Sequence, residues 1–215
     1  MSKTLDRLRV DHRRLRNVLG ALTSKGEELQ AQGASNNTDH LYCLIDYVMA
    51  YPDKVHHPLE EQVFDELVKA PLSPEQLEIV HHIRSQHHDL FLATEDLMTQ
   101  IDALANTAEV DPFVRQLRQY VELQLKHMQF EEQSVFPMAA ECIASEVWEA
   151  LDQRFGETTD PLFDEADRSY AAIYPYLVVD PEETEPTRSA EPLLRYLSAT
   201  GVPWKAPAGG DSSAS

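Results

Sequence analysis

The chain has 215 residues and is 42% hydrophobic, which is enough for one ordinary domain with a sizeable core and an appendage. Its 18 Lys and Arg against 37 Asp and Glu give a formal net charge of −19, and a field of that sign repels nucleic acid and anionic membrane surfaces. The sequence contains no run of about 18 apolar residues, no apolar leader segment, and only two cysteines, too few for a disulfide framework or a thiolate metal site. We therefore expect a cytoplasmic protein that binds neither nucleic acid nor membranes, while its oligomeric state stays open.

The first predicted helix ends near Gly33. Its apolar stripe alternates spacings of three and four residues and consists of Leu5, Leu8, His12, Leu15, Leu19 and Leu22. The loop Ser35–Asp39 offers helix-capping residue types, and a second helix is expected from about Asp39 to Lys69. Pro52 and Pro58 should bend or interrupt this second helix, because proline cannot continue the helical hydrogen-bond ladder.

A third helix is predicted to start at Pro74, with Ser73 as its cap. It carries the cleanest stripe of the chain, which consists of Val80, Ile83, His87, Leu90, Thr94, Leu97, Ile101 and Leu104. A fourth helix is expected from Asp111 to Pro137. We predict that the four helices form an all-α, up-down-up-down four-helix bundle over residues 1–140.

The rest of the chain is predicted to be less regular. A weaker helix is expected at about Ile143–Phe155 and a short one within Asp160–Tyr176, so that residues 141–178 form a helical extension packed on the bundle. From Asp180 onward, Pro, Glu, Ser, Ala and Gly dominate, and such a composition buries too little apolar surface to offset chain entropy. Residues 179–215 are therefore predicted to be a mostly disordered tail.

Two histidines occupy positions where an apolar stripe demands a core residue. His12 continues the stripe of the first helix, and His87 continues that of the third. A buried imidazole without a partner is costly, so each of them needs either a hydrogen-bond partner or a metal ion. A single such histidine is more often a satisfied core residue than a ligand.

Two related segments on the second and fourth helices place a histidine four residues before a glutamate. They are HisHisProLeuGluGluGlnValPhe at His56–Phe64 and HisMetGlnPheGluGluGlnSerValPhePro at His127–Pro137. This spacing puts an imidazole and a carboxylate on one helical face. The second segment pairs His127 with Glu131, whereas the first can pair either His56 with Glu60 or His57 with Glu61. Spacing alone leaves that choice open; we prefer Glu60 because apolar Val63 and Leu67 continue its face.

One such pair alone would be read as a surface ion pair. Two pairs combined with a core-facing histidine on each of the other two helices indicate a metal site inside the bundle, as in carboxylate-containing helical bundles. Imidazole and carboxylate ligands suit iron, manganese or zinc, and the absence of thiolates argues against structural zinc and iron–sulfur clusters.

These residues resemble the hemerythrin or HHE cation-binding domain, whose pattern is a histidine on the first helix, His-x-x-x-Glu on the second, one or two histidines on the third, and His-x-x-x-Glu or Asp on the fourth. The resemblance covers about Leu5 to Ala139 and is strongest at Tyr51–Phe64 and Lys126–Pro137. It implies two iron ions with an oxo or hydroxo bridge, ahead of manganese or zinc, and a small gaseous or peroxide partner. The implied ligands, with both glutamates bridging the metals, are His12, His56, Glu60, His87, His127 and Glu131.

The chain departs from the oxygen-carrier pattern on its third helix. That pattern has two histidines four residues apart, but Ile83 stands four residues before His87. Either His57 reaches the second metal or a water fills the position, whereas His81 and His82 point away from the apolar stripe. An open coordination position favours reactivity with small molecules over reversible oxygen carriage.

The sequence therefore favours a metal-binding protein that senses, scavenges or stores dioxygen, nitric oxide, peroxide or iron. One alternative is a di-iron oxidase or peroxidase, although the chain shows neither a flavin motif nor an iron–sulfur motif to supply electrons, so an enzyme is the less favoured reading. Another alternative is a metal-free helical interaction module, in which the histidines are structural.

Overall fold

The computed structural model describes residues 2–33, 38–107, 109–155, 170 and 173. All regular secondary structure in these ranges is helical. None of the described helices is both long enough and apolar enough to cross a membrane. The short helix predicted within Asp160–Tyr176 and the tail predicted for residues 179–215 lie outside the described residues, apart from Tyr170 and Ile173.

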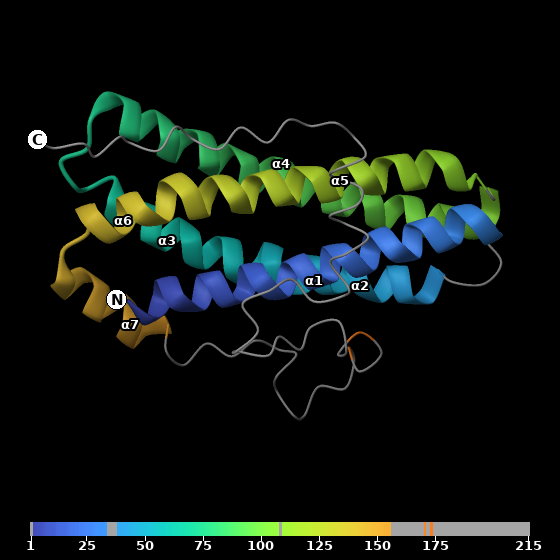
Figure 1. Cartoon of the computed structure of the whole chain (residues 1–215), viewed down its shortest axis with the longest axis horizontal. Helices are drawn as coiled ribbons and strands as arrows, with labels where there is room; N and C mark the ends of the chain where they lie inside the picture. The colour runs from blue at the N-terminus through green and yellow to red at the C-terminus, as the bar shows by residue number, and fades with distance from the viewer. Residues whose placement is uncertain (1, 34–37, 108, 156–169, 171–172, 174–215) are drawn as a thin grey trace, which may run out of the picture.

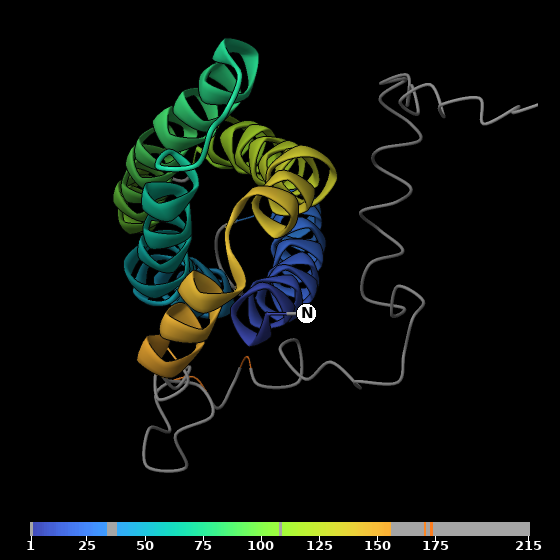
Figure 2. The same cartoon turned by 90° about the vertical axis from the view of Figure 1, so that its left-hand side faces the viewer.

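Four helical columns surround a common interior (Figures 1 and 2). Two of them are the single helices α1 (Lys3–Gln32) and α4 (Pro74–Thr107). The other two are each divided by a π-helical turn: α2 (Thr38–Ala50), η1 (Pro52–His56) and α3 (His57–Leu67) form one, and α5 (Val110–Phe130), η2 (Glu131–Val135) and α6 (Phe136–Cys142) form the other. Helices α1 and α4 each pack against both α2 and α5, so the columns enclose one core.

A further helix, α7 (Ser145–Phe155), packs on the N-terminal end of α1 and on α3. Ser2 caps α1 by accepting hydrogen bonds from the backbone N–H groups of Thr4 and Leu5. Asp152 of α7 reinforces this cap, because its carboxylate accepts from the backbone N–H groups of Lys3 and Thr4 and from the hydroxyl groups of Ser2 and Thr4. The weak helix predicted at Ile143–Phe155 is thus present, and it holds the start of the bundle.

The buried core falls into two apolar clusters with a polar layer between them. On α1, Leu8 belongs to one cluster and Leu15 to the other, and the buried His12 lies between them. Along α4, buried His87 likewise separates Ile83 from Leu97, which belong to different clusters. The apolar stripes of α1 and α4 are therefore interrupted by a polar layer that contains His12 and His87.

Both π-helical turns come just before a proline. Pro58 is the second residue of α3, after η1, and Pro137 is the second residue of α6, after η2. A proline ring collides with the carbonyl group of the residue four positions earlier in a regular α-helix, and a wider turn relieves that collision. The backbone N–H of His57 accordingly bonds to the carbonyl of Pro52, and that of Phe136 to the carbonyl of Glu131. The interruption predicted in the second column is present, and the fourth column continues beyond Pro137 to Cys142.

Candidate metal centre

The structure brings all seven side chains predicted as metal ligands together in the polar layer of the core. Every column contributes: α1 supplies one, η1 and α3 supply three, α4 supplies one, and α5 and η2 supply two. All seven residues are buried, with exposed fractions of 8% or less. They are His12, His56, His57, Glu60, His87, His127 and Glu131.

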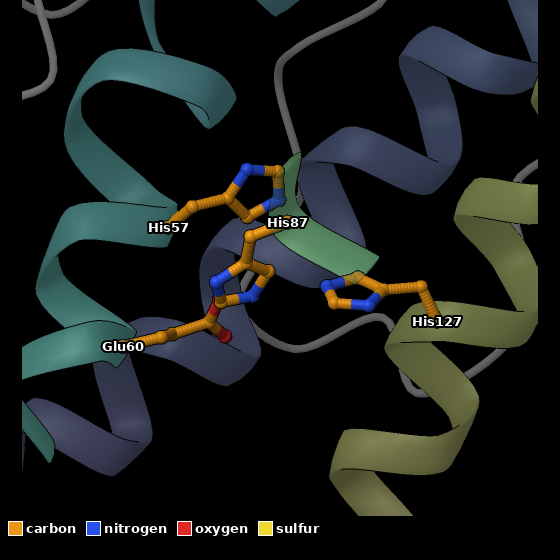
Figure 3. A group of neighbouring side chains, drawn as sticks. All are labelled: His57, Glu60, His87 and His127. Atoms are coloured by element: carbon orange, nitrogen blue, oxygen red, sulfur yellow. The ribbon is translucent and has the colours of Figure 1, made fainter. Parts of the chain in front are cut away.

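These side chains form two groups in which the candidate ligand atoms lie within 4.8 Å of one another. One group consists of His12, His56 and Glu60. The other consists of His57, Glu60, His87 and His127, and Figure 3 shows their side chains converging from three columns. Glu60 belongs to both groups, so its carboxylate lies between two neighbouring candidate positions for a cation.

The two oxygens of Glu60 face different histidines. Oε1 lies 3.4 Å from Nε2 of His12 and 3.2 Å from Nε2 of His56, while Oε2 lies 3.4 Å from Nε2 of His87. Glu131 is placed in the same way: its Oε2 lies 3.3 Å from Nε2 of both His12 and His127, and its Oε1 lies 3.4 Å from Nε2 of His87. Both carboxylates therefore span the two groups, as bridging ligands do.

Each of the five imidazoles turns Nδ1 away from the centre towards an oxygen atom. For His12, His87 and His127 the acceptors are Glu132 Oε1 at 2.9 Å, Glu61 Oε1 at 2.9 Å and Gln86 Oε1 at 3.0 Å. Nδ1 of His56 faces the acceptor Asp11 Oδ2 at 3.4 Å, and Nδ1 of His57 lies 3.4 Å from Asp53 Oδ1 at ion-pair distance. An oxygen at Nδ1 fixes the ring and places the proton there, which leaves the Nε2 lone pair for a metal.

The inward-facing nitrogen and oxygen atoms are placed to coordinate a cation rather than to hydrogen-bond with one another. Nε2 of His12, Nε2 of His127, both oxygens of Glu60 and Oε2 of Glu131 are buried and make no hydrogen bond within the described part of the chain. Leaving so many buried polar atoms unpaired is costly. Two ligands about 2.1 Å from one ion, at roughly a right angle, lie about 3 Å apart. The observed nitrogen–oxygen distances of 3.2–3.4 Å are close to that value.

The imidazoles of the site differ in charge. Burial lowers the pKa of His127 to about 4 and lowers the pKa of His57 well below its ordinary value, so both imidazoles are neutral at neutral pH. Burial alone would raise the pKa of Glu60, but the charge of His56 and the nearby ring of His12 hold it well below its usual range. Burial also opposes the charged forms of His12, His56 and His87, but the neighbouring carboxylates raise the pKa of His12 well above its ordinary value, that of His56 to about 9 and that of His87 to about 11. These three imidazoles are therefore protonated at neutral pH beside the ionised Glu60, and a metal ion that bound their Nε2 atoms would displace the protons.

The π-helical turn η1 decides which residues of the first His-x-x-x-Glu segment face the centre. Both His56 and His57 are buried there, with exposed fractions of 2% and 4%. Glu60 is fully buried, whereas the Glu61 side chain is 30% exposed and lies against His87 Nδ1 and Arg84 Nε. The structure thus combines both histidines with one glutamate, and Glu61 has an outer position.

A buried polar cluster borders the site behind His57. The side chain of Asp53 is fully buried, and burial raises the pKa of its carboxyl group to about 6. Beside it, the hydroxyl groups of Thr94 and Tyr120 lie 3.1 Å apart, and the Gln124 amide donates to the Tyr120 oxygen at 2.8 Å. These side chains fix the surroundings of His57 and extend the polar layer into the neighbouring apolar cluster.

Sequence reasoning missed the oxygen atoms that hold the imidazoles. A signal was nevertheless present, since Asp11, Gln86 and Glu132 each stand next to a predicted ligand in the sequence. The remaining histidines lie away from the centre: His81, His82 and His88 are exposed, and His40 is half-buried.

The fold and the site together define a helical bundle whose core holds a histidine and carboxylate cluster suited to metal cations. The family model described as the Hemerythrin HHE cation binding domain matches residues 3–139, and the chain belongs to this family. Comparisons with curated proteins and with solved structures give no match.

Proposed function

We propose that this protein holds a non-haem di-iron centre and uses it to bind or sense a small oxidant such as dioxygen, nitric oxide or peroxide, or to handle iron. The observation that carries the proposal is the convergence of four Nε2 atoms on two carboxylates that each face both groups, with His57 as a further member of the second group. In this arrangement His12 and His56 would hold one iron, His57, His87 and His127 would hold the other, and the carboxylates of Glu60 and Glu131 would be shared between them.

The donor set supports iron over the other first-row metals. Structural zinc sites usually use thiolates and four ligands, whereas mixed imidazole and carboxylate sets with open positions are typical of non-haem iron. The proposed division gives one ion three nitrogens and the other only two, so the second keeps more room for a small ligand. The two irons, when bound, supply the electrons or the coordination position that such an oxidant needs.

Aromatic side chains support the proposal by keeping water from the site. The ring of Phe136 stacks on His12 with the centroids 5.3 Å apart, and Phe64 stacks on His87 at 5.8 Å. Both phenylalanines are fully buried. A dry apolar lining controls solvent access and thereby the reactivity of a metal centre.

The proposal includes an up-down-up-down order of the columns. The connections between consecutive columns are short, which is typical of antiparallel neighbours in helical bundles. We also propose a cytoplasmic location, on the grounds of cysteine usage.

The test is elemental analysis of protein produced in iron-sufficient medium, together with an aerobic absorption spectrum of the same sample. About two irons per chain and oxo-bridge bands in the near ultraviolet are expected, by the ligand count above. If the protein carried no metal and took up no ferrous iron under anaerobic conditions, the di-iron proposal would be wrong and a metal-free interaction module would be the better description.

A further inference from the structure

Three arginines of α1 line a surface pocket of about 280 Å³ together with Glu132 of η2. Arg9, Arg13 and Arg16 are spaced by four and three residues, so they share one helical face. Like charges at this spacing repel one another. Such a stripe is unexpected in a chain with a formal net charge of −19, where carboxylates are abundant enough to pair with every cation.

Much of the positive charge of this pocket is not compensated. Arg13 is exposed and donates only to the backbone carbonyl of Arg9, and no carboxylate of the described residues lies within ion-pair distance of it. The guanidinium of Arg9 lies 3.4 Å from Asp6, an exposed pair that water screens strongly. The only acid in the lining, Glu132, already has both oxygens engaged, with Oε2 2.7 Å from Arg16 and Oε1 2.9 Å from His12.

We propose that Arg9, Arg13 and Arg16 form a binding site for a small anion that carries a phosphate group. Guanidinium groups present paired N–H donors that match the oxygens of phosphate, which explains why all three cations are arginines rather than lysines. The pocket volume of about 280 Å³ lies just below the range of about 300–1,000 Å³ for small-molecule sites, so a phosphate group with a small substituent fits better than a larger cofactor.

The pocket also touches the proposed metal centre. Arg16 holds Glu132, and Glu132 is the acceptor that fixes His12. An anion that draws Arg16 towards itself therefore weakens the contact between Arg16 and Glu132. Because Glu132 also holds Nδ1 of His12, the orientation of the His12 ring changes with it. This connection rests on the proposed di-iron function, whereas the anion site itself does not.

The experiment is calorimetric titration of the full-length protein with inorganic phosphate, both as purified and after iron has been removed with a chelator. The variant Arg13→Gln removes the least engaged arginine and breaks no side-chain ion pair among the described residues. Arg115→Gln is the matched control, because Arg115 is an exposed arginine on α5 outside the pocket. The titration of the iron-free protein distinguishes phosphate that binds in the pocket from phosphate that binds to iron.

We expect saturable binding in the iron-free protein, weakened about tenfold by Arg13→Gln, as for the loss of one charged hydrogen bond, and unchanged by Arg115→Gln. Equal affinities of the wild type and Arg13→Gln would overturn the proposal, and so would the absence of saturable binding at millimolar phosphate. An iron-free preparation that still binds phosphate through Arg13 would support the site even if the di-iron proposal failed.

Discussion

The imidazole of His57 stacks on that of His87, with the ring centroids 4.5 Å apart and the planes inclined by 16° (Figure 3). The two rings come from different columns, since His57 begins α3 and His87 lies in α4. Ile83 occupies the position on α4 where a second histidine of that helix would stand. His57 therefore lies beside His87, whose partner histidine on α4 is absent. The π-helical turn before His57 turns this residue towards the centre.

The first prediction tests whether His57 takes the place of the histidine that α4 lacks at Ile83. His57→Ala should reduce the iron content from about two ions per chain towards one, because the group around His87 and His127 loses a nitrogen. Elemental analysis of the purified variant measures this. His81→Ala is the control, since His81 is exposed and lies away from the centre. An iron content equal to that of the wild type would show that His57 is not a ligand.

A second prediction tests whether the Glu61 carboxylate, which lies against Nδ1 of His87, supports metal binding. Glu61→Ala should weaken iron binding by about 10–100-fold, the usual effect of removing the partner of a metal-bound histidine. Asp65→Ala is a matched control: Glu61 and Asp65 both pair with Arg84 at 2.6 Å, but only Glu61 also reaches His87. Competition with a chelator of known affinity gives the comparison. Equal losses in the two variants would mean that Arg84, rather than the contact with His87, is responsible.

Removal of iron should lower the melting temperature of the protein. Ions that bind only the folded chain stabilise it by mass action, and here they also satisfy buried atoms of Glu60 and Glu131 that have no other partner. Scanning calorimetry with and without a chelator measures the shift, and a gain of about 3–4 kcal/mol is expected when free iron is in several-hundred-fold excess over its dissociation constant. The metal-free interaction module predicts identical melting curves instead.

The pH dependence of stability should reveal the link between α7 and α1. Burial alone would raise the pKa of Asp152, but hydrogen bonds from Thr4, Lys3 and Ser2 hold it below its ordinary value of 3.8. A carboxyl group with a lowered folded-state pKa stabilises the fold above its unfolded pKa, and this contribution disappears as the pH falls through the folded pKa.

Asp152→Ala should therefore destabilise the protein by about 1 kcal/mol at neutral pH, as the loss of a helix cap does. The difference from the wild type should shrink as the pH falls below about 4. Denaturant titrations at several pH values give both quantities. Glu149→Ala is the control on the exposed side of α7 and should change little. A difference that did not vary with pH would mean that Asp152 acts by packing rather than by charge.

Much of this structure could be predicted from the sequence, because helical periodicity shows which residues share a face. His12 and His87 interrupt the stripes of α1 and α4, and the structure places both in one polar layer. The π-helical turns could not be predicted in the same way. A proline such as Pro58 indicates that the helix is interrupted, but not whether the interruption is a kink, a break or a π-helical turn. The choice between His56 and His57 had no answer in spacing alone, because the wider turn brings both inward. Asp53 lies four residues before His57 in the same column, but the other oxygens at the imidazole Nδ1 atoms come from neighbouring columns, and the sequence does not show which columns meet.

The shared position of Glu60 has a consequence for how the centre fills. If two ions bind as proposed, the first fixes the rotamers of Glu60 and Glu131 and offsets their negative charge, so it prepares ligands for the second while also repelling it. The oxygens of Glu60 are divided in this way, since Oε1 faces His12 and His56 while Oε2 faces His87. We expect the preorganisation of the two buried carboxylates to outweigh the repulsion. Uptake should then be cooperative, and chains that hold a single iron should be a minor species at every stage of loading.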